Sequence, residues 1–156
     1  MKQFIYEKDT TYRDFVVNTI LTGVTSVDVF KGRYDRLDLK YLPANSNKER
    51  LMEIKHRNFP HDKYETTIIE LDKYETITGT TKYFAPVDLL ILFEDGYVVY
   101  TPERLEKAVV KESVKYCPDQ YDGENDKWCE RKKKVVEINI VEKYFTKYED
   151  NQRPGN

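Results

Sequence analysis

The stretch RLMEIKHR, residues 50–57, decides how this chain folds. Leu51 and Ile54 are typical of a buried strand, yet Glu53 and Lys55 stand beside them. Side chains alternate across a strand, so residues two positions apart share a face. An acid and an amine are therefore predicted to project together from one face of a core strand. Burying charges is costly unless they are paired or hold a metal, so the neighbours of this strand matter.

The preceding sequence predicts the partner of this strand. Residues 33–43 alternate between apolar and polar side chains and should form the first arm of a hairpin, across a polar turn. In this arm Leu37 and Leu39 share the apolar face, and Asp38 points to the polar face toward Glu53. The hairpin thus brings a second carboxylate toward the Glu53 side chain.

The remaining patterns predict a mixed fold. The expected elements are a helix from residue 9 or 10 to 21, a strand at 25–32, a helix at 68–79 ending at Gly79, a hairpin at 87–103 and a helix at 103–110. The polar segment 115–134 is predicted to be a long loop or a two-stranded excursion, and 135–145 a final strand. This order predicts an α/β (α+β) fold with a central mixed β-sheet flanked by helices.

We expect one domain over residues 1–145, with its core at about 10–100, a C-terminal elaboration at 103–145 and a disordered tail at 146–156. The net charge of −2, from 26 basic and 28 acidic residues, offers no bulk attraction to nucleic acid. The sequence has neither a membrane-spanning apolar run nor an N-terminal secretory signal, which predicts a cytoplasmic protein without a membrane partner.

Two carboxylates on adjacent strands repel each other unless a cation lies between them. Oxygen ligands of this kind suit Mg²⁺ or Mn²⁺, and the backbone carbonyl of Ile54 can be a further ligand. A lysine at the same place can orient a water molecule or stabilise charge on a phosphate.

Asp38 followed by Glu53-Ile54-Lys55 on an apolar strand resembles the PD-(D/E)xK nuclease superfamily. The resemblance covers about residues 10–100 and implies a restriction-endonuclease-like core. It also implies metal-dependent hydrolysis of DNA phosphodiester bonds by an endonuclease, with branched DNA and phage DNA as candidate substrates.

The resemblance assigns roles to individual residues. Asp38 and Glu53 would be metal ligands, Lys55 the catalytic lysine, and Lys73 on the following helix an additional catalytic residue. Leu37 stands where the pattern has a proline, and Asp35 is an alternative first ligand.

The candidate DNA contacts are basic: Arg36, Arg57, Arg131, Lys132, Lys133 and Lys134. A homodimer would present two active sites to two strands, and a phage-encoded protein would act in the cytoplasm of its bacterial host. His56 and His61 are more typical of surface residues than of catalytic bases. Cys117 and Cys129 are too far apart for a CxxC motif and are expected to be free thiols, with a disulfide or half of a zinc site as alternatives.

Two other classes of function remain open at this level. The chain can be a catalytically inactive nuclease-fold binding module, or a phage accessory or structural protein. In either, Glu53 and Lys55 would be an ordinary ion pair on a strand, worth about 0.2–1 kcal/mol.

Overall fold

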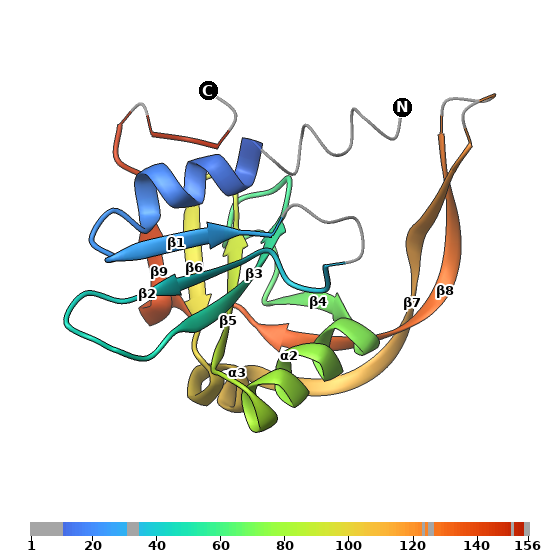
Figure 1. Ribbon diagram of the computed structural model, residues 1–156. Coiled ribbons are helices and arrows are strands. Elements are labelled where there is room, and N and C mark those ends of the chain that lie inside the picture. The colour runs from blue at the N-terminus through green and yellow to red at the C-terminus, as the bar shows by residue number, and fades with distance from the viewer. Residues whose placement is uncertain (1–10, 31–34, 123, 125–126, 151, 155–156) are drawn as a thin grey trace.

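Six strands form the central sheet, in the order β1-β2-β3-β5-β6-β9 (Figure 1). The computed structural model describes residues 11–30, 35–122, 124, 127–150 and 152–154. The strands are β1 (Ser26–Val29), β2 (Leu39–Leu42), β3 (Arg50–His56), β5 (Val87–Leu92), β6 (Gly96–Tyr100) and β9 (Phe145–Lys147). Neighbouring strands run antiparallel except β3 and β5, which run parallel. The predicted mixed sheet flanked by helices is confirmed.

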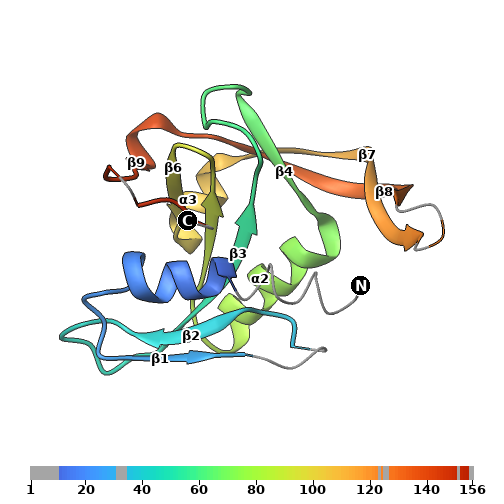
Figure 2. The ribbon, with the colours of Figure 1, turned by 90° about the horizontal axis from the view of Figure 1, so that it is seen from above.

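A second layer covers one face of this sheet. It consists of helices α2 (Leu71–Tyr83) and α3 (Pro102–Ala108) and a three-stranded sheet of β4 (Thr66–Glu70), β8 (Lys127–Asn139) and β7 (Val109–Asp122), as Figures 1 and 2 show. Parallel strands need a crossover connection, and β4 with α2 provides the one between β3 and β5. The N-terminal helical segment, α-helical at 11–15 and π-helical at η1 (Val16–Ile20), packs on the other face.

Strand β5 lies at the centre of the core because both its faces are covered. Leu89 and Ile91 pack against the α2 layer, whereas Leu90 and Leu92 pack against the N-terminal helix. All six residues of β5 are buried. A continuous apolar run is the expected pattern for a strand buried on both faces.

The first arm of the β2–β3 hairpin is shorter than predicted. Strand β2 begins at Leu39, which pairs with Met52, and the chain leaves the sheet before Asp38. Leu37 therefore packs in the α2-side core while Leu39 packs on the opposite side, so they do not share a face. Asp38 lies at the point of divergence, where its amide donates to the Met52 carbonyl at 3.1 Å.

The helix predicted at 68–79 is wrong at both ends. Residues Thr66–Glu70 form strand β4, because Thr67 and Ile69 are buried and the segment pairs with β8. The helix begins at Leu71 and continues through Gly79 to Tyr83. A Cβ at Gly79 would meet no atom within 4 Å, so no close contact requires a glycine here. Gly79 is an interior residue of the helix and does not end it.

Strands β7 and β8 form a long hairpin arm that extends away from the body (Figures 1 and 2). Its register runs from Val109 paired with Ile138 to Asp122 paired with Lys127, with two irregularities. Of the two alternatives for residues 115–134, the two-stranded excursion is confirmed. Cys117, near the root of the arm, is a buried free thiol as predicted, whereas the side chain of Cys129 lies outside the described part of the chain.

The disordered tail predicted from residue 146 starts too early. After the short helix η2 (Glu142–Tyr144), strand β9 pairs with β6, and Tyr148 is buried with its hydroxyl donating to the Phe93 carbonyl at 3.0 Å. A Cβ at Gly96 would lie 2.2 Å from the Thr146 carbonyl oxygen, so β9 approaches this closely only because residue 96 is a glycine.

Within the described part of the chain, no helix has both the length and the apolar composition needed to cross a membrane.

Candidate active site

Glu53 and Lys55 project from the same face of β3, as their spacing predicts. The Glu53 side chain is only 6% exposed, and its Oε1 lies 3.3 Å from the Lys55 Nζ. The face belongs to the α2 side of the sheet, because Leu51 on the same face packs in the α2-side core. A buried carboxylate with an ammonium beside it thus stands where an apolar pair would continue the core.

A second lysine reaches the same carboxylate from a different element. Lys73, in the first turn of α2, has its Nζ 3.4 Å from the Glu53 Oε1. The same ammonium donates a hydrogen bond to the backbone carbonyl of Arg36. Glu53, Lys55 and Lys73 are therefore brought together from a strand and a helix, and Arg36 is joined to them through its backbone.

Asp38 is held against the backbone of β3 at this place. Its Oδ2 accepts a hydrogen bond from the Ile54 amide at 2.7 Å. Because β2 begins only at Leu39, the Asp38 side chain takes the position where the next backbone partner of β3 would be. The amide and the carbonyl of one strand residue point toward the same neighbouring strand, so the Ile54 carbonyl faces the Asp38 side too.

Arg13 is a site residue that sequence analysis missed. Its Nε lies 3.7 Å from the Asp38 Oδ1, and its terminal nitrogen donates to the Phe30 carbonyl at 2.5 Å. The N-terminal helix packs on the opposite face of the sheet, and Arg13 is the residue through which it contacts the Asp38 carboxylate. A single arginine on an amphipathic helix carries no local signal of such a contact.

The electrostatics of the cluster centre on Glu53. Burial is the main cause that raises the pKa of the Glu53 carboxyl, and the negative charge of Asp38 raises it further. The two lysine ammonium groups lower it, and the pKa remains at about 7. The carboxylate form of Glu53 is thus under-stabilised by the protein alone, so an added cation beside Asp38 and Glu53 would favour it.

The donor set fits a hard divalent cation. Two carboxylates and the Ile54 carbonyl are oxygen ligands, which Mg²⁺ and Mn²⁺ prefer. The alternative first ligand, Asp35, is exposed and precedes the turn into β2. The Asp38 carboxylate is bonded directly to the backbone of β3, which makes Asp38 our choice for the first ligand.

No protein-family model and no curated protein matches this sequence. Among solved structures, the chain is similar to Hjc of Archaeoglobus fulgidus. That protein is described as a Holliday junction resolvase from an archaeal hyperthermophile. The likeness has a TM-score of 0.47 with 12% sequence identity, over 81% of this chain and 86% of that chain.

Arg57, predicted to contact DNA, is instead part of the internal packing. Its guanidinium donates to the Thr67 Oγ1 at 3.0 Å, to the His56 carbonyl at 3.1 Å and to the Ile68 carbonyl. Desolvation by burial lowers the pKa of this guanidinium. The side chain joins β3 to β4, so we assign it a structural role in place of a DNA contact.

The basic run on β8 lies closer to the site than its sequence position suggests. Lys133 has its Nζ 3.2 Å from the Glu70 Oε1, directly before the helix that carries Lys73. All four residues of the run line an open hollow of about 460 Å³ beside the start of α2: Arg131, Lys132, Lys133 and Lys134. Three carboxylates line it too, from Glu70, Asp72 and Glu75, so the hollow itself is nearly balanced in charge.

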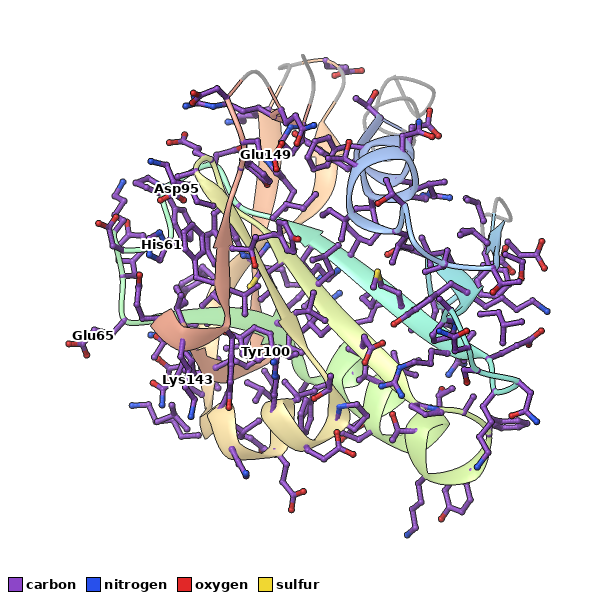
Figure 3. The ribbon with its side chains drawn as sticks, turned by 90° about the vertical axis from the view of Figure 1, so that its left-hand side faces the viewer. His61, Glu65, Asp95, Tyr100, Lys143 and Glu149 are labelled. Carbon is purple, nitrogen blue, oxygen red and sulfur yellow. The ribbon has the colours of Figure 1, made fainter. Side chains whose placement is uncertain are left out.

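His61 belongs to a separate cluster beyond the end of β3. Its Nδ1 lies 2.6 Å from the Asp95 Oδ2 and its Nε2 lies 2.8 Å from the Glu142 Oε2, while its ring stacks on Phe145. Figure 3 shows His61 and Asp95 side by side. The expectation of a surface histidine is wrong, because only 12% of the side chain is exposed.

His61, Asp62 and Asp95 also have ligand atoms close enough together to hold a metal ion. However, a carboxylate oxygen at each ring nitrogen favours a doubly protonated imidazolium, which has no lone pair for a metal. We therefore describe this cluster as an ionic clasp between two loops and η2.

Proposed function

We propose that this chain is a metal-dependent DNA endonuclease that hydrolyses phosphodiester bonds at Asp38, Glu53 and Lys55. The observation that supports the proposal is the buried Glu53 carboxylate, which lies beside two lysines from different elements. The negative charge of a second carboxylate, Asp38, contributes to the raised pKa of Glu53. Structural ion pairs are usually exposed, whereas groups with strongly shifted pKa values cluster at functional sites.

Asp38, Glu53 and the Ile54 carbonyl would hold the Mg²⁺ or Mn²⁺ ion. Such an ion supplies Lewis-acid stabilisation of phosphate charge and increases the acidity of water. Lys55 would orient the attacking water and bind a phosphate oxygen through its ammonium. Lys73 would add positive charge at the same place, where charge on the phosphate increases during the reaction. Arg13 would act as a positioning residue that fixes Asp38.

A binding module without activity is the second candidate. One observation favours it: Glu53 Oε1 already has two ammonium partners, so the cluster can be a self-contained ion triad. In that case a divalent ion would bind weakly or not at all. Metal affinity therefore separates the two candidates before any cleavage is measured.

The test combines metal binding with cleavage. Titration with Mn²⁺ should show a site in the wild type that is lost in Glu53→Gln and weakened in Asp38→Asn. Supercoiled, linear, single-stranded and branched DNA are then incubated with Mg²⁺, Mn²⁺ or EDTA. We expect cleavage with metal only, and a loss of about 100-fold or more in Lys55→Ala.

Lys40→Ala is the matched control, because Lys40 is also a strand lysine near two carboxylates, Asp28 and Glu49, at 3.7 and 3.6 Å. It should retain full activity. Absence of both the metal site and cleavage in a folded preparation would refute the nuclease proposal and support the binding module.

A further inference from the structure

A cavity of about 430 Å³ opens beside the candidate active site. Lys55 and the aromatic residues Phe59 and Tyr64 line it, together with the buried residues Thr67 and Cys117. The cavity is enclosed by the loop after β3, by β4 and by the root of the β7–β8 arm. Because Lys55 contributes to both, a molecule that reaches the Lys55 ammonium from outside can extend directly into this space.

Of the two aromatic rings that line the cavity, Phe59 is packed against the core and Tyr64 is exposed to solvent. Phe59 packs on the core residue Phe93 with ring centroids 5.9 Å apart, and meets Tyr64 edge to face at 5.0 Å. Tyr64 itself is 53% exposed. An anchored ring and an accessible ring side by side suit a flat aromatic ligand, since aromatic pairs favour offset or edge-to-face contact.

The interior of the cavity offers hydrogen bonds to such a ligand. Arg57 donates to the Thr67 oxygen, and this leaves the hydroxyl hydrogen of Thr67 as a donor. The hydrogen-bond partners of the Arg57 guanidinium within the described residues are neutral: a hydroxyl and two backbone carbonyls. Arg57 therefore holds the Thr67 oxygen from inside the protein, in keeping with its structural role, and the Thr67 hydroxyl is the group left to bond a ligand.

We propose that this cavity takes an unpaired nucleobase next to the phosphate held at Lys55. The proposal rests on the nuclease function proposed above, which puts a DNA phosphate at the Lys55 ammonium. Phe59 and Tyr64 line the same cavity as Lys55, so a base next to that phosphate would meet them on entering it. The cavity volume lies within the range of about 300–1,000 Å³ typical of small-ligand sites. A base inside a duplex is stacked on its neighbours and cannot enter.

The cavity therefore sets a preference for the form of the DNA. A strand with an unpaired nucleotide beside the cut, as in a flap, a bulge or a branch point, would be bound and cleaved better than an intact duplex. Base–aromatic stacking is tolerant of sequence, so the preference should be for structure and not for one base.

The test uses 2-aminopurine as the unpaired base, in oligonucleotides that carry it at a branch point or inside a duplex. Binding is measured in EDTA, in a Glu53→Gln background that removes carboxylate repulsion. We expect a change in 2-aminopurine fluorescence with the unpaired probe only. Tyr64→Ala should weaken its binding by about 5- to 150-fold, which is the range for removal of one base–aromatic stack. Thr67→Val, of nearly the same shape, should weaken it less.

Tyr83→Ala is the matched control. Tyr83 is also an exposed tyrosine with a lysine over its ring, Lys82 at 5.2 Å, as Lys63 lies over Tyr64 at 5.4 Å. It lies at the end of α2 and should not affect the probe.

Cleavage then separates the two proposals. Suppose that the wild type cuts DNA equally well with and without an abasic residue beside the cut, and that Tyr64→Ala cuts as well as the wild type. The base pocket is then refuted and the nuclease stands. If no DNA is cut but the unpaired probe binds through Tyr64, the pocket stands and the nuclease is refuted. Equal weakening of binding in Tyr64→Ala and Tyr83→Ala would also refute the pocket.

Discussion

The carboxylate of Asp38 accepts a hydrogen bond from the backbone amide of Ile54 at 2.7 Å, at the point where β3 extends beyond the first residue of β2. One side chain thus completes the hydrogen bonding of a core strand and adds a negative charge beside Glu53. Two substitutions separate these roles. Asp38→Asn keeps an acceptor for the amide but removes the charge, whereas Asp38→Ala removes both.

We expect Asp38→Ala to lower the free energy of unfolding by about 1–3 kcal/mol, because the Ile54 amide loses its partner. Asp38→Asn should change stability much less, but it should weaken Mn²⁺ binding and reduce the pKa of Glu53. Urea unfolding and metal titration of both variants check this. An equal decrease of stability in the two would mean that the charge, and not the hydrogen bond, holds Asp38 in place.

The raised pKa of Glu53 predicts how stability depends on pH. The folded pKa is about 7 and the ordinary value 4.5, so between these values the folded protein binds the proton more tightly than the unfolded chain does. In EDTA, stability should therefore decrease as pH rises from about 4.5 to 7, by up to about 3 kcal/mol. Glu53→Gln should lack this decrease, as urea unfolding at pH 5 and pH 8 would show. Parallel pH curves in the two proteins would contradict the assignment.

Arg57 should be needed for folding and not for charge attraction to DNA. Arg57→Met removes three donors from buried acceptors on β3 and β4, so the free energy of unfolding should fall by roughly 2–4 kcal/mol. Arg57→Lys should not restore it, because an ammonium cannot reproduce the planar fork of donors. Arg36→Met, at an exposed arginine, is the control and should remain within about 0.5 kcal/mol of the wild type in denaturant titration.

The basic run of the arm should supply part of the affinity for DNA. Neutralising all four residues of the run, Arg131 through Lys134, should weaken binding and reduce the slope of log affinity against log salt by about 0.9 for each phosphate that the arm no longer neutralises. Binding measured over a salt series gives this slope. A matched variant neutralises four exposed lysines elsewhere: Lys48, Lys82, Lys107 and Lys147. An equal effect of both variants would indicate a general charge effect and not binding by the arm.

The contribution of the His61 clasp to stability should change over a higher pH range than the contribution of Glu53 does. Burial alone would lower the pKa of His61, but the hydrogen bonds and charges of Asp95 and Glu142 outweigh it and raise the pKa. The clasp therefore stabilises the fold fully below the ordinary histidine pKa of about 6.5, and this stability is lost as pH rises through the raised folded value. His61→Gln should cost about 1–2 kcal/mol at pH 6 and less at pH 9, as measured by urea unfolding. A cost independent of pH would mean that stacking on Phe145 is what His61 contributes.

Local sequence patterns are sufficient for part of this structure. The 87–103 hairpin is predictable because two apolar runs flank a short turn, and each run forms its strand from adjacent residues. The shared face of Glu53 and Lys55 is predictable for the same reason, since a period of two follows from strand geometry alone. These features depend on neighbours in the chain, which are visible in the sequence.

Tertiary structure decided the rest. Residues 66–70 have a pattern compatible with a helix, and they form a strand because β8, more than sixty residues later, supplies the hydrogen-bond partners. The approach of Lys133 to Glu70 depends on the same pairing. Whether Arg57 reaches solvent or bonds to Thr67 was likewise decided by β4. Periodicity determines which side chains share a face, but the strand that covers the face is selected by hydrogen bonding and burial between residues distant in the chain.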